Sequence, residues 1–363
     1  MPILDRSDPW QVARYELFLA HSPFTHPMQT LAWTRVKSNW RSAQVYLEEQ
    51  GRIVAAMSIL FRRAAGPFTL AYAPRGPVCD PNNLDRLQRL LAEAKPLLRR
   101  HRAIFLRMDP EITANDTLRQ CYEAAGLRVR GEGDAMDLIQ PQRQMILSLA
   151  GQSAASLRQG YSPKARYNLG LARRRGVTVE QSFSPQALVG FYLLYQETCA
   201  RDGLSARPVA YFERMMEAFG PDHLSFFTTY YRGEALSSAI YIRYGRRAWY
   251  AYGASGNRQR NLMPNYLMQQ AMIEQALDDD MDSYNFGGVG AFSKDNGLYR
   301  FKEGFCRAQG GTLLIGELDL VRHRLLYALF NRLMPRLRRR RIERNRLPAA
   351  EEPDPCQPLS RAQ

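Results

Sequence analysis

The residues best suited to chemistry lie in the segment 283–305, SYNFGGVGAFSKDNGLYRFKEGF. An apolar run, Tyr284–Phe286, predicts a short strand, and Gly287 and Gly288 follow it directly. Glycine permits positive φ and a close approach of backbone or ligand. The polar loop that comes next ends in Leu298–Lys302, where charged residues alternate with aromatic ones. A polar, glycine-rich loop at a strand end often carries function, and an ordinary surface loop is the alternative.

The composition is that of a globular protein large enough for two domains. The chain has 363 residues, of which 45% are hydrophobic and 23% are charged, and this length allows two cores. No apolar run approaches the roughly 18–20 residues of a membrane-spanning helix. The first residues, MPILDRSDPW, lack the basic start and apolar core of a signal peptide. We therefore expect a cytoplasmic protein.

Cysteine and histidine are too scattered to indicate a metal site. The five cysteines form no C-x-x-C pair, and the five histidines form no H-x-x-x-H pair. We therefore expect no zinc site and a reducing compartment. The chain has no G-x-S-x-G motif, while Ser–His–Asp or Cys–His groups far apart in the sequence stay open. We expect neither a metal nor another cofactor.

Positive charge is unevenly distributed in a chain whose formal net charge is +15. Residues 151–179 hold six basic residues and no acidic one. A helix predicted at 163–175 places Arg166 and Arg173 on one face, two turns apart. An all-basic face favours contact with phosphate, although many such faces only keep a helix soluble. The residues that we single out as contacts for a nucleic acid are Lys164, Arg166, Arg173 and Arg174.

Helical and strand patterns follow one another in an order that occurs twice. In the first half we expect helices at 10–16, 30–37 and 84–100, and strands at 43–48, 52–61, 68–72 and 103–110. In the second half we expect helices at 163–175, 185–201, 209–219 and 264–278, and strands at 177–181, 224–231, 235–244, 247–254, 284–286 and 311–317. The repetition predicts two similar α/β domains, 1–145 and 146–316, and the order resembles acyltransferases of the GNAT type.

Several separated motifs resemble the Fem-type aminoacyltransferases (FemA, FemB and FemX). Their order and spacing make the resemblance specific between residues 164 and 302. The motifs are Arg166-Tyr167-Asn168, Arg201-Asp202-Gly203 with Arg207, Leu262-Met263-Pro264-Asn265-Tyr266-Leu267, Asp282-Ser283-Tyr284-Asn285-Phe286-Gly287-Gly288 and Gly297-Leu298-Tyr299-Arg300-Phe301-Lys302. The first half matches more loosely, through Trp33–Lys37 and Arg107–Glu111.

The resemblance implies a fold and an activity. The fold would be two GNAT-like domains, the first completed by residues 317–335. A coiled-coil arm is not expected, because residues 209–254 leave no room for one, so the compact FemX kind fits best. The enzyme would move an amino acid from aminoacyl-tRNA to an amino group of a nucleotide-linked or lipid-linked muramyl pentapeptide, a precursor of peptidoglycan. We expect it to act as a monomer.

Two other functions stay open at this stage. A Fem-like transferase would use another acceptor, such as a protein or an exopolysaccharide precursor. A non-catalytic protein on the same scaffold would bind RNA or a membrane.

The resemblance also implies which residues bind the acceptor. The uridine diphosphate and sugar would be held by Lys37, Arg207, Tyr211 and Tyr252. The alternative for each is structural. A lysine at a helix end is usually solvated, and a tyrosine inside a strand or helix often belongs to the core.

Lys302 and Asp109 would lie at the reaction itself. An ester donor is already activated, so positioning and stabilisation of an oxyanion matter more than a protein nucleophile. The resemblance implies that Lys302 faces the ester carbonyl or the terminal phosphate of the tRNA. Asp109 would lie near the acceptor amine, and this carboxylate, the leaving ribose hydroxyl or a phosphate would take the proton.

The last part of the chain is strongly basic. Residues 319–346 contain ten arginines and two acidic residues, and Leu325, Leu326 and Leu329 precede the run Arg338–Arg341. Part of the segment would dock on the first domain. The rest has the pattern of a basic amphipathic element on an anionic bilayer. We therefore expect peripheral contact with the inner membrane surface and a basic, partly disordered tail at 336–363.

One departure from GNAT acetyltransferases yields a prediction. Those enzymes bind the pyrophosphate of coenzyme A with a glycine-spaced turn at a helix N-terminus. The corresponding segment here is Arg258–Asn265, which contains no glycine. We expect no binding of acetyl-coenzyme A, and calorimetric detection of micromolar affinity for coenzyme A would contradict this.

Overall fold

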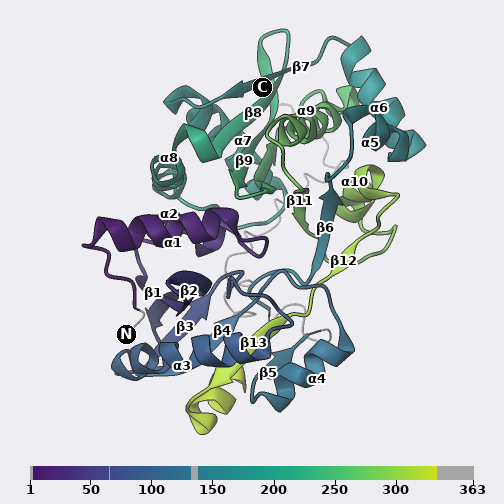
Figure 1. The fold of residues 1–363 in the computed structure, drawn as a ribbon. Helices are drawn as coiled ribbons and strands as arrows, with labels where there is room; N and C mark the ends of the chain where they lie inside the picture. The colour runs from purple at the N-terminus through teal and green to yellow at the C-terminus, as the bar shows by residue number, and fades with distance from the viewer. Residues whose placement is uncertain (1–2, 65, 132–137, 333–363) are drawn as a thin grey trace, which may run out of the picture.

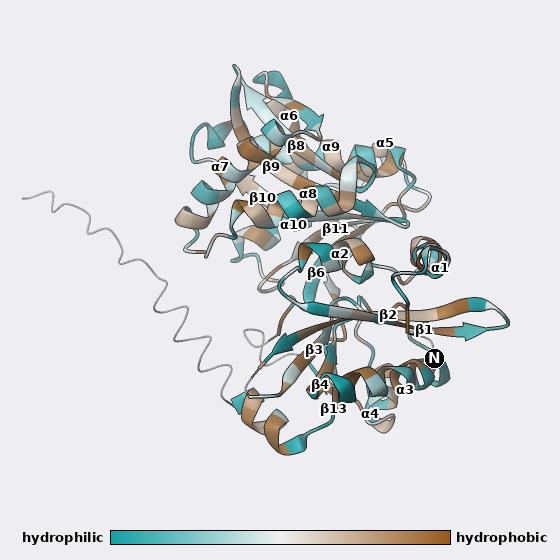
Figure 2. Ribbon diagram, turned by 90° about the vertical axis from the view of Figure 1, so that its left-hand side faces the viewer, coloured by the Kyte–Doolittle hydropathy of each residue, from teal (hydrophilic) through white to brown (hydrophobic). Residues whose placement is uncertain are grey.

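The computed structural model describes residues 3–64, 66–131 and 138–332. Two β-sheets lie one above the other, and α1 (Pro9–His21) and α2 (Leu31–Val36) occupy the space between them (Figures 1 and 2). Glu16 of α1 ties these parts together, because one of its carboxylate oxygens accepts a hydrogen bond from Leu31 N at 3.0 Å and the other accepts one from Tyr244 Oη at 2.8 Å.

The first sheet has six strands in the order β1-β2-β3-β4-β13-β5. Their bounds are β1 (Arg41–Glu49), β2 (Arg52–Arg63), β3 (Thr69–Ala73), β4 (Ala103–Met108), β5 (Arg128–Arg130) and β13 (Glu317–Val321). β3 and β4 are parallel, and the other neighbouring pairs are antiparallel. The helices α3 (Leu84–Arg100) and α4 (Asp116–Ala124) pack against this sheet. The apolar residues of α3 recur every three or four positions, so they form one buried face.

The second sheet has seven strands in the order β12-β6-β11-β10-β9-β8-β7. Their bounds are β6 (Arg143–Ser148), β7 (Thr178–Ser182), β8 (Leu224–Tyr231), β9 (Glu234–Tyr244), β10 (Arg247–Ser255), β11 (Ser283–Gly288) and β12 (Thr312–Leu313). Here β10 and β11 are the parallel pair, so each sheet holds one parallel pair among antiparallel neighbours. The predicted boundary at residues 145 and 146 stays a prediction, and it falls inside β6.

Helices cover both faces of the second sheet. The remaining elements are η1 (Pro27–Gln29), α5 (Ala154–Gly160), α6 (Pro163–Arg174), α7 (Pro185–Arg201), α8 (Val209–His223), η2 (Arg260–Leu262), α9 (Pro264–Asp278) and α10 (Gly297–Cys306). Because side chains alternate along a strand, β9 sends Ile240 and Ile242 to the core under α7 and α8. It sends Ala239 and Tyr241 to the core under α9 and α10.

The expected final strand at 311–317 is wrong, because this segment supplies two strands of different sheets. β12 pairs with β6 in the second sheet, and β13 inserts between β4 and β5 in the first. Buried charge fixes β13 in place. The Arg107 guanidinium donates to both carboxylate oxygens of Asp319, at 2.8 and 2.7 Å, and lies 3.0 Å from the Glu317 carboxylate.

The chain continues beyond β13 as a helical segment at residues 324–332. Tyr327 is buried on β4, and its hydroxyl donates to Asp319 at 2.6 Å. Leu325 and Leu329 on the same segment are exposed. Among the described residues, the helices are all too short or too polar to cross a bilayer. The expected tail at 336–363 lies outside the described residues.

Candidate active site

A pocket of about 260 Å³ opens where the parallel strands of the second sheet diverge. The pairing of β10 with β11 ends at Trp249 and Asn285. The residues that follow on both strands line the pocket, among them Tyr250, Gly253 and Gly287. The ends of β3 and β4 contribute Arg75 and Glu111 to the same space. Ligands of open sheets bind at the carboxyl ends of parallel strands, and here two such pairs meet at one pocket.

Lys302 lies at this pocket on α10. Its side chain is buried, and Nζ donates a hydrogen bond to the carbonyl oxygen of Gly288 at 2.9 Å. Burial lowers the pKa of Lys302 to about 8, because an ammonium loses hydration in a low-dielectric site. Among the described residues, no carboxylate forms an ion pair with it. Within the described residues, the hydrogen-bond partner of this positive charge is a neutral carbonyl oxygen.

The two glycines of β11 allow the lysine to reach the strand end. Gly287 has φ of +81°, a conformation that other residues rarely adopt. A Cβ on Gly288 would lie 2.2 Å from Cβ of Pro141, so a larger residue would displace the loop before β6. The sequence prediction of a strand followed by closely packed backbone is confirmed at this point.

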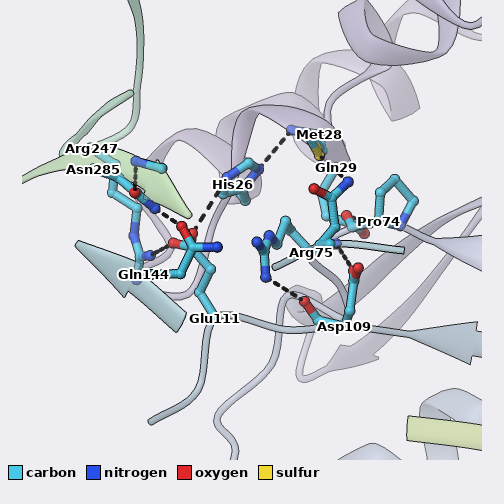
Figure 3. A network of polar contacts seen from close by, with 12 residues as sticks. His26, Met28, Gln29, Pro74, Arg75, Asp109, Glu111, Gln144, Arg247 and Asn285 are labelled. Atoms are coloured by element: carbon cyan, nitrogen blue, oxygen red, sulfur yellow. Dashed lines mark hydrogen bonds and ion pairs between the residues drawn. The ribbon is translucent and has the colours of Figure 1, made fainter. Parts of the chain in front are cut away.

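Glu111 connects the first sheet to the second (Figure 3). Its carboxylate accepts hydrogen bonds from Asn285 Nδ2 at 2.7 Å and from Arg247 Nη1 at 2.9 Å. Arg247 also donates to the carbonyl oxygen of Pro23 at 2.9 Å. Burial would raise the pKa of Glu111, but the positive charges of Arg75 and Arg247 hold it below its usual value. The carboxylate is therefore ionised and already engaged by the protein.

His26 is a neutral member of this network. Burial lowers its pKa to about 3. Its Nδ1 accepts a hydrogen bond from Met28 N at 3.0 Å, which leaves the proton on Nε2, 3.8 Å from the Glu111 carboxylate. The imidazole also packs against the Trp249 ring.

Asp109 lies behind the pocket wall. It is fully buried, and its two carboxylate oxygens accept hydrogen bonds from Tyr72 Oη at 2.7 Å and from the backbone N–H of Arg75 at 2.5 Å. Burial raises the pKa of Asp109, and the positive charge of Arg75 opposes this shift. Asp109 is not among the residues that line the pocket, whereas Arg75 is, and Figure 3 shows Arg75 between Asp109 and Glu111.

The structure brings Lys37, Arg207, Tyr211 and Tyr252 together in a second cluster. The Lys37 ammonium lies 5.0 Å and the Arg207 guanidinium 4.7 Å from the centroid of the Tyr211 ring. Tyr252 donates to the Tyr211 hydroxyl at 3.2 Å, and Lys37 lies 3.4 Å from the same oxygen. Burial lowers the pKa of Lys37 to about 8, and the charge of Arg207 acts in the same direction.

A pair of tryptophans joins this cluster to the pocket. Lys37 lies over Trp33, at 5.1 Å from the ring centroid, and Trp33 packs against Trp249 with 6.2 Å between centroids. Trp249 lines the pocket, and Tyr252 follows it by three residues on β10. The cluster and the Lys302 pocket are therefore linked through these two rings.

The four basic residues predicted to contact nucleic acid are all exposed on α6. The helix packs beside α10, since Ser162 N donates to Gly304 O at 2.8 Å. Arg166 is turned back to its own chain, where it donates to the carbonyl oxygens of Gln159 and Tyr161 at 3.0 and 2.6 Å. Arg173 lies 3.9 Å from Glu274. The side chains of Lys164 and Arg174 are exposed to solvent.

Three groups of the site were not singled out from the sequence as functional residues. Arg75 and Glu111 each follow an expected strand, and Trp249 lies near the start of one. A charged residue at the end of a buried strand is the available signal. Choosing between Asp109, Glu111 and Arg75 requires the side-chain directions, which the sequence does not give.

The arrangement of sheets defines the class of protein as a tandem GNAT-like fold. The crystal structure of FemX aligns with a TM-score of 0.82 at 24% identity, covering 91% of this chain and 100% of that one. A tandem GNAT protein from the clavulanic acid biosynthesis pathway aligns with a TM-score of 0.54 at 11% identity, covering 88% and 97%. The predicted fold, two GNAT-like domains with no coiled-coil arm, is confirmed.

The chain belongs to the FemAB family, whose model matches residues 11–233 and 228–334. It is 37% identical to the UDP-N-acetylmuramoylpentapeptide-lysine N(6)-alanyltransferase of Weissella viridescens, over 90% of this chain and 98% of the relative. It is 28% identical to the lipid II:glycine glycyltransferase of Staphylococcus saprophyticus, over 90% and 97%.

The burial of Lys302 predicts a pH-dependent effect on stability. Its native pKa of about 8 lies below the ordinary lysine value of 10.5, so between these values the unfolded chain binds more protons than the native state. At pH 7 the buried ammonium therefore lowers the free energy of unfolding, and this loss is recovered as the pH rises through this window. We expect Lys302→Met to flatten the rise of the urea midpoint between pH 8 and pH 10. The exposed Lys164→Met should leave the slope unchanged, and equal slopes for all three proteins would refute the effect.

Proposed function

We propose that this protein transfers an aminoacyl group from aminoacyl-tRNA to an amino group on the stem peptide of a peptidoglycan precursor. The observation that supports this best is the continuous site formed by the Lys37 cluster and the Lys302 pocket, joined by Trp33 and Trp249. The relatives from Weissella and Staphylococcus, an alanyltransferase that acts on a muramoyl pentapeptide and a lipid II:glycine glycyltransferase, agree with it.

The Lys37 cluster is suited to the phosphate-bearing end of the acceptor. Lys37 and Arg207 each place a cation against the Tyr211 ring, and no ion pair within the described chain neutralises either. Phosphate would pair with both charges, while the tyrosine hydroxyls of Tyr211 and Tyr252 would bind sugar or uracil groups. A nucleotide-linked and a lipid-linked precursor share this pyrophosphate chemistry.

Lys302 supplies the positive charge for the acyl transfer. The acceptor amine attacks the ester carbonyl carbon, a C–N bond forms, and the bond from carbon to the ribose oxygen breaks. The oxyanion that develops in between would be stabilised by the Lys302 ammonium, which acts strongly in a buried site. The amine loses one proton as the amide forms, and the leaving ribose oxygen gains one. This proton passes directly to the ribose oxygen, or by way of Asp109 or a phosphate. Asp109 is buried but does not line the pocket.

The donor would approach along α6. Lys164 and Arg174 are open to solvent beside α10, which carries Lys302. A tRNA acceptor stem laid on this helix would place its terminal ester near the pocket, with the phosphates paired to the basic residues. Arg166 and Arg173 belong to the proposed contact only if the tRNA displaces their present partners.

A transfer assay tests the proposal. Purified protein is incubated with charged tRNAs as donors and with nucleotide-linked or lipid-linked muramyl pentapeptide as acceptors, and the products are analysed by mass spectrometry. We expect one aminoacyl mass to be added to the acceptor. Replacement of Lys302 by alanine should lower kcat by about 100- to 1000-fold, the usual cost of losing one oxyanion-stabilising group.

The matched control is Lys294→Ala, which removes an exposed lysine from the same segment. It should keep wild-type kcat and KM. The proposal is refuted if no acceptor gains mass with any donor, or if Lys302→Ala is as active as Lys294→Ala.

We also propose that the helical segment at 324–332 and the basic residues after it rest on an anionic membrane. Leu325 is 88% exposed and Leu329 is 52% exposed, while Tyr327 on the opposite side anchors the segment to β4. Two outward leucines followed by clustered arginines have the composition of a peripheral membrane contact. The enzyme would then work at the cytoplasmic face of the membrane.

Vesicle sedimentation tests the membrane contact. A chain ending at Pro335 should bind anionic vesicles at least tenfold more weakly than the full chain, because each basic residue near such a surface contributes about 1 kcal/mol. Binding to neutral vesicles should be weak for both proteins. Equal binding of the shortened and full chains to anionic vesicles would remove the proposal.

A further inference from the structure

Arg75 is held in the pocket wall by an unusually well-defined turn. Its φ of +54° lies in the left-handed region, which a non-glycine residue adopts only where its surroundings enforce it. Asp109 Oδ1 accepts the Arg75 backbone N–H at 2.5 Å. Gln29 donates to the carbonyl oxygen of Pro74 at 2.7 Å and accepts from Ser58 N at 2.8 Å. The turn is therefore fixed from both sides.

The Arg75 side chain has more donors than partners. It is 6% exposed and lines the pocket. In the described part of the chain, its single side-chain hydrogen bond is a long one, 3.4 Å from Nη1 to the backbone oxygen of Asp109. A guanidinium carries five N–H groups, and buried donors are normally satisfied. The unused donors face the pocket.

The nearest pocket carboxylate forms no ion pair with Arg75 in the described part of the chain. The oxygens of Glu111 accept hydrogen bonds from Asn285 and Arg247 instead. The other charged group at the pocket is Lys302, which is also a cation and likewise forms no ion pair within the described residues. The pocket therefore holds two cations that are available to an anion.

We propose that Arg75 binds an oxoanion of a substrate in the Lys302 pocket, and that Asp109 acts through Arg75 as a positioning residue. A planar guanidinium pairs with two oxygens of a carboxylate or a phosphate at once. The proposal deepens the proposed function, on which the identity of the substrate rests. The oxoanion would be a phosphate near the end of the donor tRNA or a carboxylate of the acceptor peptide.

The contacts of Asp109 give it this positioning role. Both of its oxygens are occupied, one by Tyr72 and one by the Arg75 backbone, and its side chain does not line the pocket. Without the carboxylate, the backbone N–H of Arg75 would lose its buried partner and the strained turn would relax. An asparagine would keep the essential contact, since its Oδ1 can accept the Arg75 N–H while Nδ2 donates to the Tyr72 oxygen.

The first experiment measures oxoanion binding without any transfer reaction. Thermal unfolding midpoints are recorded against inorganic phosphate at constant ionic strength, for wild type, Arg75→Met and the exposed-surface control Arg52→Met. A ligand of the native state raises the midpoint with its concentration. We expect Arg75→Met to need at least tenfold more phosphate for the same rise, with Arg52→Met unchanged. The same phosphate response in Arg75→Met and wild type would overturn the proposal.

A second variant covers the case in which Arg75→Met does not fold. Arg75→Lys keeps the charge but loses the planar pair of donors. A weaker phosphate response than wild type supports the site, and an unchanged response overturns it. If phosphate binding depends on Arg75 but wild type transfers no aminoacyl group, the proposed function fails while the oxoanion site stands.

Steady-state kinetics identify the source of the oxoanion. Arg75→Met should raise KM about 10- to 100-fold for one substrate, as expected for a lost charged hydrogen-bonded pair. A change confined to aminoacyl-tRNA assigns a donor phosphate, and a change confined to the muramyl peptide assigns an acceptor carboxylate. An unchanged KM for both substrates would overturn the proposal.

Variants of Asp109 separate positioning from proton transfer. We expect Asp109→Ala to raise the KM for the same substrate that Arg75→Met affects. The KM of the double variant should be no higher than that of Arg75→Met alone. Asp109→Asn should bring the KM most of the way back to the wild-type value. The pH profile of kcat should keep its wild-type shape in Asp109→Asn. Loss of the acidic limb in Asp109→Asn, or additive effects in the double variant, would overturn the positioning role.

Discussion

Positive charge held away from bulk water is the constraint on which this site depends. Lys302 donates to a carbonyl oxygen, Lys37 lies between aromatic rings, and Arg75 keeps most of its donors directed at a pocket. A buried cation without a carboxylate partner reduces the stability of the empty protein. The same burial strengthens its attraction to an anion. The protein therefore carries a destabilising arrangement that a bound anion would relieve.

The two sheets position these cations through the same arrangement of strands. Each sheet contains one parallel pair, and both pairs direct their carboxyl ends towards the space between the sheets. The first pair supplies Arg75 and Glu111, and the second frames the pocket that Lys302 enters. Glu111 then bonds across to Arg247 and Asn285, so the relative position of the sheets is set by a buried ion pair at the site itself. A rotation of one sheet against the other would break this contact and open the pocket at the same time.

Much of the fold was predictable because the periodicity of the sequence is strong. The helix expected at 84–100 matches α3, and that expected at 185–201 matches α7, since both have start signals and a regular apolar face. The strand 311–317 was wrong because a glycine at 316 with φ of +99° separates two short strands that belong to different sheets. Distance along the chain does not reveal which sheet such short strands join.

The site was less predictable than the fold. The motif around Lys302 was recognisable, and the structure gathers Lys37, Arg207, Tyr211 and Tyr252 in one cluster. Their proposed roles stay predictions. Arg75 and Glu111 could not be identified as site residues from the sequence, because a charged residue after a strand is common. Only three-dimensional contacts distinguish a buried charge from a solvated one. The partners of Arg166 could not be foreseen for the same reason, since they are backbone oxygens of the preceding loop.

The position of β13 has a consequence for synthesis on the ribosome. The strand lies between β4 and β5 and supplies Asp319 and Glu317 to Arg107, yet more than two hundred residues separate it from β4. Until those residues have been translated, the amino-terminal sheet has two unpaired strand edges and an arginine whose counter-charges do not yet exist. Exposed edges of this kind attract other chains. The nascent protein thus stays vulnerable to misassembly until β13 has been translated, and a chaperone bound to the emerging first half would protect it over that interval.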